Sequence, residues 1–488
     1  MKLLIDTNVL IPLEPGSKTD LEPNTPVAAE LLRTAQQVGA TIYLHPIQRK
    51  DIEQDKDADR RALRLRLIEK YPQLPSPPVP SLILLGEIGS PPSGSNGWID
   101  AHLIAALDRD LVDFLVTEDQ GIHKRCARVS RAAQCRTISQ ALARLRDDLP
   151  AEPTPLPAVQ CLLAHELIET DPIFASFRED YPEFDQWLAK CRRQHRPCRV
   201  IKLPGRANYA GVCILNREDR VWADAHNPTL KICTFKIADD VLGMKLGELL
   251  LKTVFDYAAA NKFGAIFIEA FPKHTVLLDL LDCFGFSKSF EKPNGEIELR
   301  KRLVPWGEIS ELHPFEFHRE FGPHQIKFDG AKVFVVPIEP RFHAMLFPDL
   351  QEQLDLFAGT ESFGNTIRKA YLCNSGITTL EPGSVLLFYR SQDIQQINAV
   401  GIVEETLRTR NADELARFAR KRTVYERKDI EAKTSQGEAL GILFRYAPVL
   451  SDNIRLSELL QVGVLKAAPQ SIQQLKEEAV SWIRTRLK

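Results

Sequence analysis

Two strand-like apolar runs that each end in acidic side chains constrain this chain more than any other feature. The first ten residues read MKLLIDTNVL, so Asp6 stands at the tip of the first run. A second run, residues 112–117, ends in an acidic pair that includes Asp119, and Asp100 lies shortly before it in a helical pattern. Strand ends and helix starts meet at one edge of a parallel sheet, where α/β proteins place their sites. Carboxylates gathered there are the oxygen ligands that Mg²⁺ and Mn²⁺ prefer.

The first 146 residues alternate between strand-like and helix-like segments, which predicts a three-layer α/β domain with a parallel sheet. We expect strands at 2–5 and 40–44 and helices at 27–38 and 49–71. The proline-rich segment 72–92 is expected to be an exposed loop.

Composition bounds the class of protein. A chain of 488 residues has room for roughly three domains. Its net charge of −2 means that a nucleic-acid surface must be a local patch. Nine cysteines without a CxxC pair argue against a disulfide framework or a structural zinc site and indicate reduced thiols in a cytoplasm. We see no signal peptide and no apolar run long enough to span a membrane.

Residues 1–146 resemble a PIN-type nuclease domain in four motifs that occur in the family's order. The motifs are IDTNVL with Asp6, RKDIEQD with Asp51, NGWIDAHLIAAL with Asp100 and FLVTEDQGI with Asp119. The resemblance implies that these four acids are catalytic. It also implies that Asp6, Asp100 and Asp119 bind one or two Mg²⁺ or Mn²⁺ ions, which activate water for phosphodiester cleavage.

Alternatives stay open within this site. The family more often has Glu as its second acid, and Glu53 and Asp55 compete with Asp51 for that place. Thr117 could hydrogen-bond a metal-bound water. Asp is also a common helix cap and turn residue, so each acid alone could be purely structural. The ordered set favours the nuclease site.

A proline-rich linker, residues 147–159, leads to a second domain at 160–302 that resembles GNAT acetyltransferases, an α+β fold. The matching segments are LKICTFKI, DDVLGMKLGE and LLLKTVFDYA. The resemblance implies that Gly243, Lys245 and Gly247 form a loop whose backbone N–H groups bind the pyrophosphate of acetyl-CoA. Lys245 stands where the family has Gly or Ala. A fold does not imply a function, so a non-catalytic scaffold remains the alternative to acetyl transfer.

Other positions that the GNAT family uses also differ. Leu281 replaces the tyrosine that protonates the leaving thiolate, and His274 replaces an asparagine. Glu269 and His274 are the candidates for a general base.

Residues 303–360 form a bridging region, and residues 361–488 resemble the PUA-like barrels of the ASCH/EVE type in EPGSVLLFYRS, INAVGIVEE and LGILFRY. The resemblance implies a small β-barrel that binds RNA or modified bases. The three histidines of the bridging region, His313, His318 and His324, are expected to be satisfied structurally and not to bind metal. The candidate RNA-binding residues are Arg368, Lys369, Arg417, Arg420, Lys421 and Arg422. A solvated helix face is the alternative for the basic stretch 408–428.

These resemblances share one partner, RNA. Our first hypothesis is a cytoplasmic, Mg²⁺- or Mn²⁺-dependent endoribonuclease of the toxin type, with tRNA as the first substrate to test. PIN-type toxins commonly have a small antitoxin protein as partner and commonly form dimers. The resemblance therefore implies an antitoxin partner and a homodimer. The alternatives are an acetyl-CoA-dependent N-acetyltransferase acting on an RNA-linked substrate, and a non-catalytic RNA-binding regulator.

Overall fold

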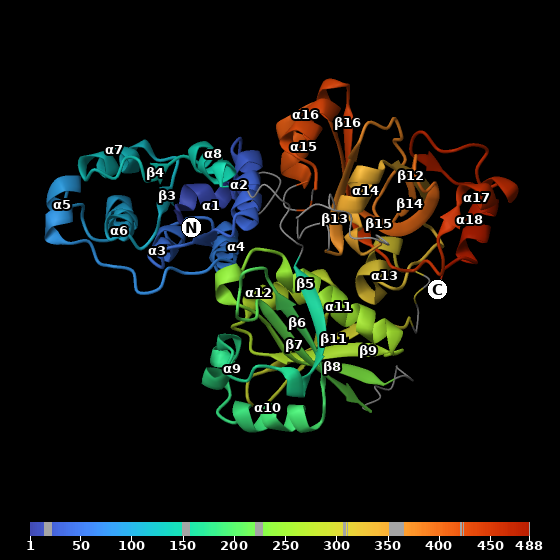
Figure 1. Cartoon of the computed structure of the whole chain (residues 1–488), viewed down its shortest axis with the longest axis horizontal. Helices are drawn as coiled ribbons and strands as arrows, with labels where there is room; N and C mark the ends of the chain where they lie inside the picture. The colour runs from blue at the N-terminus through green and yellow to red at the C-terminus, as the bar shows by residue number, and fades with distance from the viewer. Residues whose placement is uncertain are drawn as a thin grey trace. The chain divides into compact units, whose positions relative to one another are not determined.

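The computed structural model describes residues 1–13, 22–148, 157–219, 228–305, 309, 311–350, 366–419, 422 and 424–487. The chain forms two compact units. Figure 1 shows their helices and strands. The first unit is Met1–Thr154 with Asp239–Met244, and the second is Pro155–Ala238 with Lys245–Lys488. Much of the expected linker, residues 149–156, lies outside the described residues, as do residues 351–365 of the bridging region and the last expected domain.

The first unit is built on a four-stranded sheet in the order β2-β1-β3-β4, with every neighbouring pair parallel. This confirms the parallel α/β sheet expected from sequence. The strands are β1 (Lys2–Ile5), β2 (Thr41–Tyr43), β3 (Phe114–Val116) and β4 (Cys135–Arg136). Because alternate residues point to opposite faces, Leu3 and Ile5 enter one hydrophobic core and Leu4 enters the other.

Helices cover both faces of this sheet. One core includes residues of α1 (Thr7–Leu13), α2 (Thr25–Gln37) and α8 (Ile138–Asp147). The other core includes residues of α5 (Leu82–Ile88), α6 (Asn96–Asp108) and α7 (Gln120–Arg128). The unit therefore has the three layers that the sequence predicts.

Two helix expectations in this unit are wrong. Residues 49–71 form two helices, α3 (Gln48–Glu53) and α4 (Ala58–Ile68), because Asp57 caps α4 by accepting a hydrogen bond from the Arg60 backbone N–H. The segment expected to be a loop contains α5, whose first turn is capped by Ser81. Local capping by polar side chains explains both departures.

The second unit contains two sheets. The first has the order β10-β11-β9-β8-β7-β6-β5, in which only β8 and β9 pair in parallel. Its first strand, β5, lies at one edge and, among the described strands, pairs with β6 alone. The strands of this sheet are β5 (Ala158–Leu163), β6 (Pro197–Lys202), β7 (Gly211–Glu218), β8 (Thr229–Ile237), β9 (Ala265–Ala270), β10 (Ser287–Glu291) and β11 (Ile297–Arg302). The helices of this region are α9 (Ala175–Asp180), α10 (Phe184–Arg193), α11 (Leu246–Ala260) and α12 (Thr275–Cys283).

The second sheet runs β13-β16-β15-β14-β12-β18, with β17 paired to β15. Its strands are β12 (Val333–Ile338), β13 (Arg368–Cys373), β14 (Val385–Arg390), β15 (Gln396–Thr409), β16 (Ala439–Tyr446), β17 (Ile454–Arg455) and β18 (Gln473–Gln474). The helices of this part are α13 (Pro314–Phe321), α14 (Pro340–Leu346), α15 (Ala412–Ala419), α16 (Arg427–Ser435), α17 (Leu456–Gln461) and α18 (Glu477–Arg484).

The sequence predicts a barrel for this part, but the described strands form an open path from β13 to β18. Both faces of the sheet are buried. Phe334 and Val336 enter a core with residues of α14, α15 and α16, whereas Val333 and Val335 enter a second core with residues of α13, α17 and α18. The sheet therefore buries its two faces against helices, whereas a barrel would bury one face by closing on itself.

The three histidines of the bridging region have structural partners, as expected. His313 caps α13, the His318 ring bonds the carbonyl oxygen of Gln325, and His324 lies 3.2 Å from a carboxylate oxygen of Asp256. Within the described ranges, no helix has the length and apolarity needed to cross a lipid bilayer.

Candidate functional site

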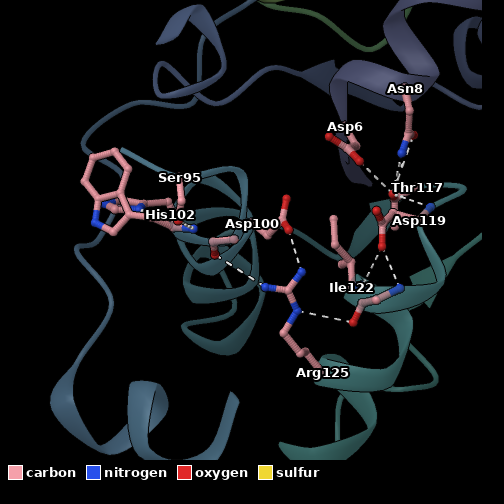
Figure 2. A network of polar contacts seen from close by, with 12 residues as sticks. Asp6, Asn8, Ser95, Asp100, His102, Thr117, Asp119, Ile122 and Arg125 are labelled. Atoms are coloured by element: carbon pink, nitrogen blue, oxygen red, sulfur yellow. Dashed lines mark hydrogen bonds and ion pairs between the residues drawn. The ribbon is translucent and has the colours of Figure 1, made fainter. Parts of the chain in front are cut away.

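Asp6 lies at the carboxyl end of β1 and is 8% exposed. Its backbone N–H donates to the carbonyl oxygen of Val116, which continues the pairing of β1 with β3. Its carboxylate accepts hydrogen bonds from the Thr7 backbone N–H at 2.6 Å and from the Thr117 hydroxyl at 2.7 Å. The strand end therefore holds this side chain in one orientation, as Figure 2 shows.

Thr117 links the ends of β1 and β3. Its hydroxyl oxygen accepts from the Asn8 amide at 3.1 Å and from the Asp119 backbone N–H at 3.0 Å, while it donates to Asp6. The Asn8 side-chain oxygen also accepts from the Glu118 backbone N–H at 3.2 Å. The DTN and TED tripeptides thus bond to each other across the sheet edge.

Asp100 projects from α6 and pairs with Arg125 of α7 at 2.5 Å. The Arg125 guanidinium makes two more contacts, to the carbonyl oxygens of Gly97 at 3.4 Å and Gly121 at 3.2 Å. Arg125 is not among the residues predicted from sequence, because its partner lies 25 positions away in the chain.

Asp119 is the N-cap of α7. Its carboxylate accepts from the backbone N–H groups of Gly121 at 2.5 Å and Ile122 at 3.0 Å. The capping role considered as an alternative is therefore real for this residue. Both capping bonds go to Oδ1 of Asp119, so its Oδ2 takes no part in the cap.

Electrostatic effects connect the four acids. Burial raises the pKa of Asp6 to about 6, bonds from Thr117 and Thr7 oppose this shift, and the charges of Asp100 and Asp51 add to it. Burial also raises the pKa of Asp100, the Arg125 contact opposes that rise, and the charges of Asp119 and Asp51 add to it. We call Asp6, Asp51, Asp100 and Asp119 the acid site.

Glu53 and Asp55, the two alternatives to Asp51 as the second acid, each pair with an arginine. Glu53 pairs with Arg49 one helical turn away at 3.2 Å. Asp55 pairs with Arg60 at 2.6 Å and with Arg64 at 3.0 Å, and these bonds lower its pKa. Neither acid is among the charges that act on Asp6 or Asp100, which favours Asp51 as the second acid.

The acid site suits a divalent cation in donor type and in charge. All its donors are carboxylate oxygens, and mutual repulsion among them is the condition that a bound cation relieves. Across the described ranges, no three acidic, histidine or cysteine side chains already stand close enough together to enclose an ion. Arg125 holds Asp100 and the first turn of α7 holds Asp119, so enclosing an ion requires these side chains to move.

Trp98 and His102 of α6 and Lys50 of α3 form an aromatic and basic cluster that is not among the residues predicted from sequence. Trp98 is two residues before Asp100 on α6, and its ring contacts that of His102 at a centroid distance of 4.3 Å. The ammonium of exposed Lys50, the neighbour of Asp51, lies 5.0 Å from the Trp98 ring centre. The signal available in the sequence was the tryptophan within the motif NGWIDAH.

The loop proposed for coenzyme binding has an unusual backbone. Gly243 and Lys245 have φ angles of 84° and 60°, in the left-handed region. Lys245 is the N-cap of α11, and Gly247 lies in the first turn of this helix. Glycine adopts such φ angles without strain, so a lysine at position 245 costs free energy that the family's glycine avoids. Gly243 belongs to the first unit, whereas Lys245 and Gly247 belong to the second.

The two candidate bases differ in basicity. Burial raises the pKa of Glu269, but hydrogen bonds from Lys231 and Lys292 outweigh burial and leave the pKa lowered. Burial lowers the pKa of His274, although nearby Asp180 opposes this. His274 is therefore neutral at pH 7 and able to accept a proton, whereas Glu269 is a weak base.

Two of the candidate RNA-binding residues, Arg368 and Lys369, face inward. Arg368 pairs with Glu404, and its backbone N–H donates to Glu248 at 2.7 Å. Lys369 is 1% exposed and lies 5.6 Å from the Phe347 ring centre. These two residues do not lie on an exposed basic surface, because β13 is buried on both faces of its sheet.

The remaining candidates are less informative. Arg422 lies 3.7 Å from Glu404. Arg417 belongs to α15 and is partly buried. Arg420 and Lys421 lie outside the described residues.

Comparison with known proteins gives structural similarity without a family. No family model matches the chain, and no curated protein matches it. Solved structures similar to parts of the chain include ASCH from Zymomonas mobilis, at 14% identity over 32% of this chain and 96% of that one, with a TM-score of 0.25. They also include a GNAT family acetyltransferase from Elizabethkingia anophelis with acetyl-CoA bound, at 19% identity over 30% of this chain and 98% of that one, with a TM-score of 0.24. The IAA acetyltransferase from Bacillus cereus matches at 18% identity over 30% of this chain and 100% of that one, with a TM-score of 0.24. At these values the similarities establish no family and no activity.

Proposed function

We propose that the first unit is a divalent-cation-dependent nuclease that cleaves RNA. The observation that carries this proposal is the acid site: the charges of Asp100 and Asp51 add to the raised pKa of Asp6, and those of Asp119 and Asp51 add to the raised pKa of Asp100. A protein that keeps such repulsion beside a sheet edge gives up stability there, and a bound cation would compensate for this loss.

The residues have distinct roles in this proposal. Asp6, Asp100 and Asp119 would hold Mg²⁺ or Mn²⁺, with Asp51 in support. A bound ion supplies an activated water and stabilises charge on the leaving oxygen. Thr117 keeps Asp6 in place through its 2.7 Å hydrogen bond, so this ligand is orientated before the cation arrives.

The Trp98 ring and the Lys50 ammonium support single-stranded RNA as the substrate class. Each base of a single strand can stack on an aromatic ring, and such stacking contributes about 1–3 kcal/mol per base. Lys50 would contact a phosphate next to the stacked base. Trp98 and Asp100 are two positions apart on α6 and point to different sides of this helix, so the RNA strand would pass around the start of α6 between the stacked base and the acid site.

Cleavage by the purified whole chain tests the proposal. Total tRNA, a single-stranded RNA oligonucleotide and the same sequence as duplex RNA would be incubated with Mn²⁺, with Mg²⁺, or with EDTA. We expect discrete products with metal, none with EDTA, and restored cleavage when Mn²⁺ is added in excess of EDTA. Cleavage that is equally fast in EDTA, or no cleavage of any substrate, would reject the nuclease.

A second candidate function is acetyl-CoA binding by the second unit. The specific observation is that β8 and β9 pair only up to Ile232 and Ile268, while β8 continues to Ile237 before α11 begins. Beyond Ile232, β8 offers a backbone edge along which a pantetheine chain would bond, and the start of a helix favours phosphate. The similar GNAT structure from Elizabethkingia anophelis has acetyl-CoA bound.

Calorimetric titration with acetyl-CoA separates this candidate from a scaffold. Measurable binding that weakens when Gly247 is replaced by Val would support it, because a Cβ at this position already lies 3.1 Å from the Leu280 side chain. A chain without acetyl-CoA affinity is not an acetyltransferase. If neither cleavage nor coenzyme binding is found, the non-catalytic RNA-binding regulator becomes the better account.

A further inference from the structure

Arg125 places a positive charge inside the acid site. Its guanidinium contacts the Asp100 carboxylate, as Figure 2 shows. It also donates to the carbonyl oxygens of Gly97 and Gly121. A Cβ at either glycine would lie 3.7 Å from a guanidinium nitrogen, an ordinary van der Waals distance, so the guanidinium packs closely against both helix starts. The Arg125 side chain is 19% exposed and therefore has a path to solvent.

The two helix starts around Arg125 disfavour a cation, and its bonds to Asp100 and to two carbonyl oxygens offset this. Gly97 and Gly121 lie in the first turns of α6 and α7, and helix N-termini repel positive charge. Asp100 is the carboxylate that compensates, through a 2.5 Å contact. A divalent ion that used Asp100 would compete with the guanidinium for the same carboxylate and would also repel it.

The same features make the location favourable for a phosphate. Helix N-termini attract anions, and a guanidinium binds phosphate oxygens through two parallel hydrogen bonds. An arginine released from Asp100 would thus have a new partner within reach if an RNA backbone lay across the acid site.

We propose that Arg125 exchanges partners: it neutralises Asp100 in the metal-free protein and binds a phosphate of the RNA backbone once a divalent cation takes Asp100. This inference rests on the proposed nuclease function. It makes Arg125 a substrate-binding residue and makes metal and RNA binding mutually reinforcing, because each ligand favours the state in which Arg125 has left Asp100.

Mn²⁺ titration of the RNA-free whole chain by calorimetry tests the first half. Arg125→Gln removes the competing charge, so its Mn²⁺ affinity should rise about 5-fold. Arg128→Gln is the matched control, since it removes the same charge from the exposed last turn of the same helix. Its Mn²⁺ affinity should stay within about 2-fold of wild type, because long-range effects of exposed charges are screened.

RNA binding tests the second half, measured by fluorescence anisotropy of a labelled single-stranded oligonucleotide. In EDTA, Arg125→Gln should change RNA affinity by less than about 2-fold, since Asp100 already holds the arginine. In Ca²⁺, which serves as a probe cation, the same variant should bind about 10-fold more weakly than Arg128→Gln.

The outcomes separate this inference from the function on which it rests. An Arg125→Gln protein with Mn²⁺ affinity equal to or weaker than that of Arg128→Gln overturns the exchange. If Asp100→Asn also leaves Mn²⁺ binding unchanged, the acid site holds no metal and the nuclease proposal fails as well. If Arg125→Gln does not fold, Arg125→Lys replaces it. The lysine cannot keep the contacts to Asp100 and to both glycine carbonyl oxygens at once, so it competes less well and its Mn²⁺ affinity should still exceed that of the control.

Discussion

Asp6 is the residue where function and stability conflict most clearly. Its pKa of about 6 means that the folded protein binds this proton more tightly than the unfolded chain does. The resulting stability is fully present below the unfolded pKa, near 3.8, and is lost as the pH rises through about 6. At neutral pH the charged carboxylate therefore destabilises the first unit.

Replacing Asp6 by Asn should stabilise the first unit while removing a metal ligand. At pH 7.5 we expect a gain of about 2 kcal/mol in the free energy of unfolding, shrinking to under about 1 kcal/mol at pH 4. Thermal or urea unfolding at the two pH values measures it. Asp59→Asn, on the exposed start of α4, is the control and should show no such gain. A variant destabilised equally at both pH values would contradict the account.

Some residues of the acid site could be predicted from the sequence, and others could not. The motifs identified Asp6, Asp100 and Asp119 because strand ends and helix starts can be recognised locally. They could not choose among Asp51, Glu53 and Asp55, since the choice depends on which acids find arginine partners. Arg125 was missed for the same reason. Lys369 was expected on a surface, but strand pairing buries it.

Helix α7 is the element that joins capping to the proposed chemistry. Asp119 caps it through bonds to Gly121 and Ile122, and Arg125 extends from it to Asp100. Ser is as good an N-cap as Asp, whereas Ala is a poor one. Changes at position 119 can therefore separate the cap from the charge.

Asp119→Ser should leave unfolding of the first unit within about 0.5 kcal/mol of wild type, while Asp119→Ala should cost about 1 kcal/mol. Both variants lose the carboxylate, so both should reduce metal-dependent RNA cleavage, by about 10- to 100-fold. Denaturation and RNA cleavage measured on both variants distinguish a ligand of the cation from a helix cap. If Asp119→Ser keeps full cleavage, the residue is only a cap.

Helices and strands could be predicted from the sequence where a local pattern of apolar residues determines them. Apolar runs marked β1, β2 and β3, and helical spacing marked α2. The break between α3 and α4 and the strand β5 depend on single caps and on a distant pairing partner. The expected barrel is an open sheet, because helices cover both of its faces.

Across the whole molecule, buried histidines set the response to acid. Burial lowers the pKa of His45 to about 4, of His318 to about 3 and of His343 to about 4. Each stays neutral in the folded state, while the unfolded chain takes up a proton near pH 6.5. Stability contributed in this way is present above pH 6.5 and is lost as the pH falls toward the folded pKa.

The second unit should be the more acid-sensitive one, because His318 and His343 act together there while Asp6 opposes His45 in the first unit. Between pH 6.5 and pH 5 we expect each buried histidine to cost about 1–2 kcal/mol. Calorimetric melts across this range should show the second unit's transition falling more steeply. Replacing both histidines by Gln should flatten its slope. The same change at exposed His165 should not, and equal slopes in all three proteins would refute the explanation.

The proposed nuclease depends on carboxylates at one sheet edge that hold a divalent cation for RNA cleavage. The most direct measurement is the rate of cleavage of a single-stranded RNA against Mn²⁺ concentration for Asp100→Asn and Asp108→Asn. Both residues lie on α6, and only Asp100 acts on the charge of Asp6. We predict about a 100-fold loss at saturating Mn²⁺ for Asp100→Asn and an unchanged rate for Asp108→Asn. Equal rates for the two variants would contradict the account.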